Sequence, residues 1–250
     1  MALEASQHYG DEVVAPTGVE VFVIMIRNRK KAKKETGYPD IREAVRLVAV
    51  KCPRLRTSCY WAGTSSIATE VLGHRRSMDL DFHTLQALGD VRPILAEAQK
   101  VFGRRFRLVE TPDLFGSGFR GVLKLPSGRS IGFEVLSNYE DVRKSDLEPS
   151  SSAPGMLRVS LGRYLADKVQ CLVERVEARD LVDILAVIHH KPALRARLCK
   201  LVLTQDAVLL AERLLGWTDR SIVKDLAAYR DVDPKDAVSA RNLILDWIRK

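Results

Sequence analysis

The sequence has little of what marks a membrane-embedded or disulfide-stabilised protein. No apolar run approaches the roughly 20 residues that a membrane span needs; the longest near the N-terminus covers residues 21–26. Acidic residues precede this run and basic residues follow it, which is the reverse of a secretory signal. The four cysteines show no C-x-x-C spacing, so neither a zinc knuckle nor a disulfide framework is indicated. We expect a reduced, cytoplasmic protein that does not enter a membrane.

What the sequence does contain is ordinary apolar content and a surplus of positive charge. Its 250 residues are 46% hydrophobic and 29% charged, which excludes wholesale disorder and allows one large domain or two smaller ones. Lys and Arg number 40 against 32 acidic residues, a net charge of +8, and they crowd residues 27–34 and 104–107. Such clusters favour a polyanionic partner such as nucleic acid, although a solvated helix face or a mobile arm has the same composition.

Hydrophobic periodicity separates a basic N-terminal segment from a mixed α and β region. Residues 1–38 contain turn residues and little periodicity, so we expect this segment to be partly flexible. Within residues 39–145, a helical pattern begins at Pro39 and is stopped by Pro53. Further helices are expected over residues 65–72 and 93–102, and strands over residues 57–61, 77–83, 105–110, 118–125 and 129–136. This mixture predicts an α/β (α+β) fold with a sheet of about four or five strands.

Residues 145–159 have the composition of a linker and separate the mixed region from a helical one. They contain Pro149, a run of three serines, Pro154 and Gly155. Residues 156–250 are helical in period nearly throughout, so we expect a helical C-terminal domain. Its expected helices cover residues 161–176, 181–189, 193–203, 207–214, 221–229 and 234–248.

The most informative segment is a strand pattern over residues 77–83 that carries two aspartates. Polar and apolar residues alternate without exception, so Asp79 and Asp81 project from one face while the apolar residues enter the core. Two carboxylates about 6–7 Å apart bridge hard divalent cations, and oxygen-only ligands favour Mg²⁺ or Mn²⁺ over Zn²⁺. An edge strand with solvated acids shows the same D-x-D pattern.

A glycine turn precedes this strand and leads into a helix. It consists of Gly63, Thr64, Ser65 and Ser66. A helix N-terminus presents free backbone N–H groups and the positive end of the helix dipole, which suits a phosphate group, and the three hydroxyls add donors. A simple glycine turn with a serine N-cap is the alternative. The D-x-D strand within twenty residues favours phosphate binding.

A third carboxylate is available on a later strand. In the strand expected over residues 129–136, the apolar residues share one face and Glu134 lies on the opposite face. Gly132 beside it leaves room for a close approach. Glu134 is therefore our candidate to complete the metal site, with an outward-facing strand acid as the alternative.

These motifs occur in an order that resembles a known family. The motifs are Trp61-Ala62-Gly63-Thr64-Ser65-Ser66, then Leu72-Gly73-His74-Arg75-Arg76-Ser77-Met78-Asp79-Leu80-Asp81-Phe82, and later Lys168, Arg175 and Arg179-Asp180-Leu181-Val182-Asp183-Ile184. They resemble the AbiEii/AbiGii-type nucleotidyltransferase toxins of the polymerase-β-like superfamily, whose signature is a Gly-Gly-Thr-Ala-Leu-like loop followed by His-Arg-x-Ser-x-Asp-x-Asp-Phe. Ala62 stands where the family usually has its first glycine, and Ser65-Ser66 replaces Ala-Leu.

The resemblance implies roles for residues whose local pattern is ambiguous. It implies that the Lys168 ammonium contacts the triphosphate and that Asp180 or Asp183 orients this lysine or the nucleotide. Beside these roles, His74, Arg75 and Arg76 are placed to reach phosphates, and Arg76 and Ser77 are our further candidates for nucleotide binding. Local patterns alone are also consistent with a snorkelling Lys168, with Asp180 stabilising a helix start, and with an i,i+4 ion pair between Arg179 and Asp183.

The resemblance implies a polymerase-β-like nucleotidyltransferase core, expected over residues 39–145, followed by the helical domain. The expected activity is the metal-dependent transfer of a nucleoside monophosphate from an NTP to an acceptor hydroxyl. By resemblance the chain is a toxin of a toxin–antitoxin or abortive-infection pair, with RNA, and tRNA in particular, as acceptor and an antitoxin protein as partner. Transfer to a protein side chain, or a non-catalytic binding module, is the alternative; the change at Ala62 motivates the latter.

Overall fold

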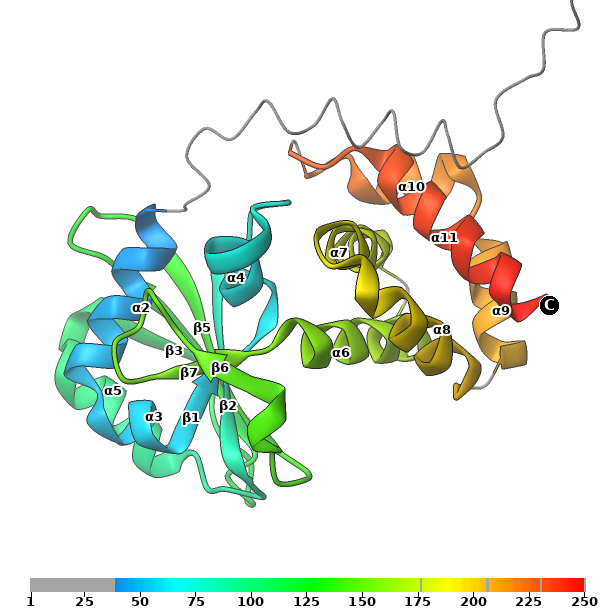
Figure 1. Cartoon of the computed structure of the whole chain (residues 1–250). Coiled ribbons are helices and arrows are strands. Elements are labelled where there is room, and N and C mark those ends of the chain that lie inside the picture. The colour runs from blue at the N-terminus through cyan, green and yellow to red at the C-terminus, as the bar shows by residue number, and fades with distance from the viewer. Residues whose placement is uncertain (1–38, 176, 206, 230, 250) are drawn as a thin grey trace, which may run out of the picture. The chain divides into compact units, whose positions relative to one another are not determined.

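A seven-stranded mixed sheet forms the first part of the described chain (Figure 1). The computed structural model describes residues 39–249 except 176, 206 and 230, all within one compact unit, residues 37–250. The basic segment predicted over residues 1–38 lies outside the described residues. The strands are β1 (Cys59–Trp61), β2 (Asp79–Ala87), β3 (Phe106–Glu110), β4 (Gly118–Lys124), β5 (Ser130–Asn138), β6 (Leu147–Pro149) and β7 (Leu157–Val159).

The sheet order is β3-β4-β5-β2-β1-β7-β6. Strand β2 pairs in parallel with β5, and β1 pairs in parallel with β7; the other pairs are antiparallel. The prediction of four or five strands is wrong, because β6 and β7 lie in the segment interpreted as a linker. Each has three residues, which is too short for an alternating pattern to be recognised.

The glutamate Glu70 holds the loop between β6 and β7. Its carboxylate accepts hydrogen bonds from the Ser150 hydroxyl at 2.6 Å and from the Ser152 backbone N–H at 2.7 Å. It also forms an ion pair of 2.9 Å with the buried Arg158 on β7. The serine-rich segment therefore forms an ordered turn. The Glu70 carboxylate that accepts its hydrogen bonds lies 80 residues before Ser150 in the chain.

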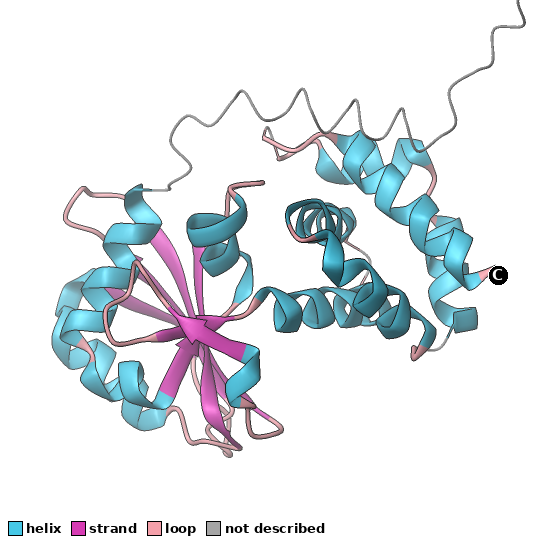
Figure 2. Cartoon of the chain, viewed as in Figure 1, coloured by secondary structure: helices cyan, strands magenta, loops and turns pink. Residues whose placement is uncertain are grey.

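Three helices cover one face of the sheet, as Figure 2 shows in cyan against the magenta strands. They are α2 (Pro39–Lys51), α3 (Pro53–Ser58) and α5 (Arg92–Phe102). Their apolar sides share a core with Leu80 and Phe82 of β2 and with the buried residues of β4 and β5. Pro53 stops α2 as predicted but also opens α3, since proline is tolerated in the first turn of a helix. The strand predicted over residues 57–61 is consequently shortened to β1.

The segment between β1 and β2 is helical and ends in a glycine. Helix α4 (Gly63–Ile67) continues directly into a π-helical turn, Ala68–Leu72. Gly73 follows with φ 59°, a left-handed conformation in which glycine avoids the steric cost of a side chain. Short 3-10 turns occur at Gly103–Arg105, Lys144–Asp146 and Pro192–Leu194.

The remainder of the described chain is helical, as predicted. The helices are α6 (Leu161–Glu174), α7 (Ala178–His190), α8 (Arg195–Leu203), α9 (Ala207–Gly216), α10 (Asp219–Leu226) and α11 (Pro234–Ile248). Their apolar faces form a second core, which Tyr60 of β1 and Ile67 of α4 join from the sheet side. Side chains Ser160, Thr218 and Asp233 cap α6, α10 and α11 by accepting backbone N–H groups.

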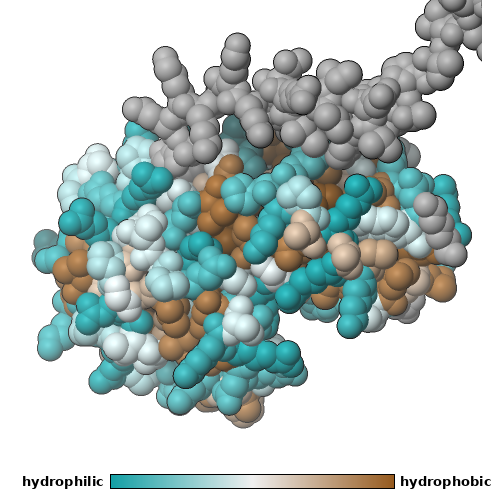
Figure 3. All heavy atoms as spheres, in the orientation of Figure 1, coloured by the Kyte–Doolittle hydropathy of each residue, from teal (hydrophilic) through white to brown (hydrophobic). Residues whose placement is uncertain are grey.

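Polar residues are frequent on the surface of the described chain. On the face drawn in Figure 3, hydrophilic residues cover much of the described surface and separate smaller groups of hydrophobic residues. Within the described ranges, none of the helices combines the length and the apolar character that a membrane crossing requires.

Candidate active site

Three acidic residues lie on one face of adjacent strands β2 and β5. Along β2, Leu80 and Phe82 are fully buried, whereas Asp79 is exposed and Asp81 is partly buried on the other face. The parallel pairing sets Asp81 opposite Glu134. Residues in register on paired strands project from the same face, so the sheet brings Glu134 beside the two aspartates.

Two glycines make space for the aspartates. A Cβ on Gly132 would lie 2.1 Å from Oδ1 of Asp79, and a Cβ on Gly63 would lie 2.0 Å from Oδ2 of Asp81. Gly63 also has φ 66°, which disfavours any side chain. Gly63 opens α4, so the start of this helix is in direct contact with the Asp81 carboxylate.

The electrostatics of the three acids fit a cation site. Burial, and then the nearby charges of Glu134 and Asp79, raises the pKa of Asp81 to about 7. Arg120 on β4 donates a hydrogen bond to Glu134. Among the described residues, no group of three His, Cys, Asp or Glu side chains forms a ready-made metal cluster. Carboxylate oxygens that repel one another are nevertheless the kind of ligand that Mg²⁺ or Mn²⁺ prefers, so the three acids remain candidate ligands for such an ion.

The hydroxyls of the α4 turn are bonded within the protein. Ser65 Oγ accepts a hydrogen bond from the Trp61 indole N–H at 3.0 Å, and Ser66 Oγ donates to the Gly63 carbonyl at 2.9 Å. Ala62, the residue before the helix, provides no side-chain cap. The first backbone N–H groups of a helix have no intrahelical acceptor, which applies here to Gly63, Thr64 and Ser65. Gly63 is partly exposed and the other two are buried, so the candidate phosphate site lies at Gly63, where the helix begins.

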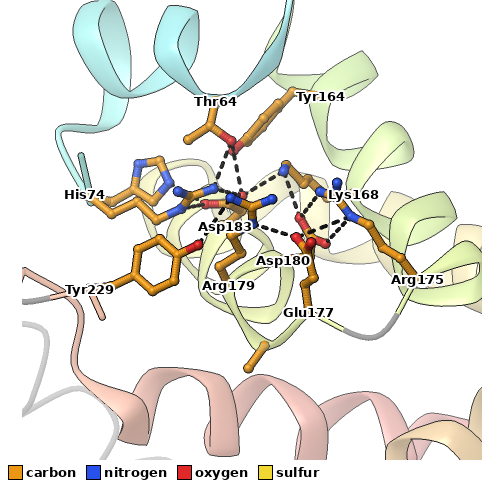
Figure 4. Close-up of polar contacts among 12 residues, drawn as sticks. Thr64, His74, Tyr164, Lys168, Arg175, Glu177, Arg179, Asp180, Asp183 and Tyr229 are labelled. Atoms are coloured by element: carbon orange, nitrogen blue, oxygen red, sulfur yellow. Dashed lines mark hydrogen bonds and ion pairs between the residues drawn. The ribbon is translucent and has the colours of Figure 1, made fainter. Parts of the chain in front are cut away.

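The carboxylate of Asp183 is the centre of a buried polar cluster (Figure 4). Arg75 donates from Nε at 2.6 Å and from Nη2 at 2.8 Å. His74 Nε2 lies 2.8 Å away, and the Thr64 hydroxyl donates at 3.2 Å. Arg75 Nη2 also donates to Thr64 Oγ1 at 2.9 Å. The cluster thus connects the α4 turn to helix α7.

Lys168 on α6 completes this cluster between two aspartates. Its ammonium lies 2.7 Å from Asp180 and 2.8 Å from Asp183, and 5.3 Å from the centre of the Tyr164 ring. Burial disfavours the charged lysine, but Asp183, Tyr164 and Asp180 together outweigh this effect and raise the pKa of Lys168 above its ordinary value. Burial likewise disfavours ionised Asp183, yet Lys168 and Arg75 hold its pKa well below the usual range. Both groups are therefore charged at neutral pH.

Asp180 is also held by Arg175, in a forked pair of 3.0 and 3.1 Å. Arg179 pairs instead with Glu177 at 2.6 Å, and its guanidinium donates to the Tyr229 hydroxyl at 3.1 Å. An ion pair between Arg179 and Asp183, one local interpretation of the sequence, is not among the contacts of the described residues.

The structure brings together most, but not all, of the predicted site residues. Arg76 is exposed and donates its backbone N–H to Asp231 at 2.6 Å. Ser77 is partly buried and lies just before β2. The sequence interpretation did not foresee Arg75 and Tyr164 as members of the cluster. For Arg75, the available signal was its position beside His74 in the motif; for Tyr164, it was one helical turn before Lys168.

The fold is similar to those of solved nucleotidyltransferase structures. The fold is similar to that of an H. pylori protein described as a nucleotidyltransferase, with a TM-score of 0.54 at 16% identity, covering 83% of this chain and 95% of that chain. The nucleotidyltransferase toxin MenT4 from Mycobacterium tuberculosis gives a TM-score of 0.46 at 15% identity, covering 84% of this chain and 83% of that chain. The first of these likenesses shows a nucleotidyltransferase-like fold, and the mixed sheet followed by a helical C-terminal region agrees with the predicted fold class.

The sequence defines the family. The model of the family described as nucleotidyl transferase AbiEii toxin, type IV toxin–antitoxin system, matches residues 62–242. The chain belongs to this family of nucleotidyltransferase toxins, as the motifs predicted. Membership implies an NTP substrate and a cognate antitoxin. No curated protein gives a significant match to the chain.

Proposed function

We propose that this toxin transfers a nucleoside monophosphate from an NTP to a hydroxyl group of RNA, with tRNA as the acceptor, in the cytoplasm and with a divalent cation. The observation that carries the proposal is the direct contact between the start of α4 and the acidic face of the sheet, where Gly63 meets Asp81. A phosphate-binding turn and cation-binding carboxylates are the two parts that nucleotidyl transfer requires at one place.

Asp79, Asp81 and Glu134 would hold Mg²⁺ or Mn²⁺. When bound, the ion supplies positive charge to the phosphate oxygens and to the leaving pyrophosphate. The raised pKa of Asp81 supports this assignment, because its causes, after burial, are the other two carboxylates. Glu134 would have to release the Arg120 guanidinium, to which it is bonded in the structure.

The residues around the α4 turn would bind the nucleotide. Backbone N–H groups of Gly63, Thr64 and Ser65 would contact the triphosphate, with Ser66, Arg76 and Ser77 nearby. Lys168 would add positive charge behind the turn. Because its pKa is raised and it is already paired, it would act through its charge and not by transferring a proton. Asp180 and Asp183 would hold its ammonium in place.

The chemical step balances without a further reactant. The acceptor hydroxyl oxygen forms a bond to the α-phosphorus, and the bond from that phosphorus to the pyrophosphate oxygen breaks. The hydroxyl proton passes to Glu134, and pyrophosphate leaves with its electron pair. The chain's own contribution is to align the two reactants and to offset negative charge.

The acceptor is proposed to be RNA because the chain carries a net charge of +8 and because strands β3 and β4 carry exposed cations on the face of the sheet that bears the three acids. Incubating the purified full chain with labelled NTP, Mg²⁺ and total RNA tests this. We expect nuclease-sensitive label, and we expect Asp79→Asn with Asp81→Asn to abolish it. A matched control is Glu140→Gln with Asp246→Asn, which removes two exposed acids elsewhere. Label that survives the first double substitution, or that travels with protein, contradicts the proposal.

A further inference from the structure

The open face of the sheet continues beyond the acidic residues onto strands β4 and β3. Two rows of paired residues cross this face. One row runs from Asp81 through Glu134 and Arg120 to Glu110. The adjacent row runs from Asp79 through Gly132 and Val122 to Arg107. Since paired residues project from the same face, the cations of β3 and β4 share a surface with the acids.

Along the second row the charge changes from negative at Asp79 to positive at Arg107. Arg107 and Lys124 are both exposed, and neither has an ion-pair partner in the part of the chain that the structure describes. Three interstrand spacings of about 4.8 Å place Arg107 roughly 14 Å from Asp79. Lys124 lies two residues from Val122 on β4, on the same face. A cationic area formed by Arg107 and Lys124 therefore shares the face of the acidic site, two to three strands away from Asp79.

The two substrates of a transfer reaction must approach the reacting phosphorus from opposite sides, because the attacking and leaving oxygens are in line. The α4 turn and Lys168 lie toward strand β1 in the strand order, where the helical core covers Tyr60. Glu134 lies on the other side of Asp81, toward β4. The acceptor hydroxyl therefore has access from β4 and β3.

We infer that the single-stranded end of the RNA acceptor lies across β4 and β3, with its phosphates on Arg107 and Lys124. This inference rests on the proposed function and deepens it. Lys and Arg bind phosphates by releasing counterions, without reading the base sequence. This surface would fix where the terminal hydroxyl lies relative to Glu134, and other elements would select the RNA.

The test compares two double substitutions in the full chain that remove the same charge. Arg107→Gln with Lys124→Gln neutralises the cationic area. Lys51→Gln with Lys100→Gln removes two exposed lysines from α2 and α5, which pack on the other face of the sheet. RNA labelling is measured against RNA concentration, NTP concentration and salt, and circular dichroism checks the fold.

We expect the first pair to raise the KM for RNA roughly tenfold and to lower the slope of log KM against log salt by about 1.4, at about 0.7 for each phosphate contact on a single strand. The KM for NTP stays unchanged, and the control pair behaves as wild type. Equal RNA kinetics for the two pairs overturns this inference alone. A wild-type protein that labels no RNA, or labels protein instead, overturns the proposed function and this inference with it.

Discussion

Gly132 and Asp79 are in register on adjacent parallel strands, and Oδ1 of Asp79 occupies the space where a side chain at position 132 would begin. The 2.1 Å distance is far below any normal contact of a Cβ. The position of one proposed metal ligand therefore depends on the absence of a side chain on the neighbouring strand.

The first prediction follows from this contact. Gly132→Ala should force the Asp79 carboxylate to rotate, because the contact is with the end of a flexible side chain and not with backbone. A displacement of about 1 Å in a reacting group costs roughly 100-fold in rate. We expect such a loss in RNA labelling with little change in Tm. Gly216→Ala is the control, since a Cβ there meets nothing within 4 Å. Unchanged labelling by the Gly132 variant would show that Asp79 is not needed in this position.

The raised pKa of Asp81 makes the stability of the folded protein depend on pH, which gives a second prediction. The folded protein raises the pKa of Asp81 from 3.8 to about 7, so folding favours the neutral acid. The stability that comes from this proton is present below about pH 4 and is lost as the pH rises through about 7. Asn cannot ionise. In chelator-containing buffer, Asp81→Asn should therefore exceed wild type in Tm by a margin that grows from pH 4 to pH 7 and then stays constant. A margin independent of pH would contradict the raised pKa.

The third prediction is that the buried cluster around Asp183 stabilises the fold. Asp183→Asn leaves Lys168 and Arg75 buried without their shared counter-charge. Removing one partner of a buried pair costs about 3–5 kcal/mol, which corresponds to a fall in Tm of roughly 10 °C for a domain of this size. Asp231→Asn is the control, because Asp231 and its partner Arg76 are both solvent-accessible. Thermal unfolding of the two variants distinguishes them, and similar small shifts would refute the structural role of Asp183.

The fourth prediction separates the two ways in which Ser65 can act. Its hydroxyl accepts the Trp61 indole N–H, and both residues are fully buried. Ser65→Ala leaves that N–H without an acceptor, at a cost of about 1–3 kcal/mol. If Ser65 binds phosphate through its backbone, the KM for NTP should stay within about threefold of wild type. Calorimetry and labelling kinetics measure the two effects. A large rise in KM without a loss of stability would show that the hydroxyl binds the nucleotide.

Local patterns were sufficient for the acidic strand and for most helices. The alternation around Asp79 and Asp81 identified both the strand and its polar face, because side-chain direction follows a period of two. The same rule assigned Glu134 to the polar face of β5. Its position opposite Asp81 depends on strand pairing, which the alternation does not specify.

Long-range contacts account for what the sequence did not predict. Thr64 and Asp183 are 119 residues apart, and Arg75 and Asp183 are 108 apart; no local period relates such positions. The segment that forms β7 was interpreted as a linker. Its three residues form a strand because they pair with β1 and because the preceding loop is bonded to Glu70. Its own composition gave no strand signal.

The Asp183 cluster joins parts of the chain that a cut between β6 and β7 would separate. One carboxylate binds side chains from the α4 turn, from the segment before β2 and from α6. A break in the loop between β6 and β7 would put Arg75 on one fragment and Asp183 and Lys168 on the other. Each fragment would then have to hydrate charges that the intact chain neutralises internally. Two such fragments should therefore be active only when they associate. This loop is thus a position at which we expect the toxin to be divisible into two separately inactive fragments.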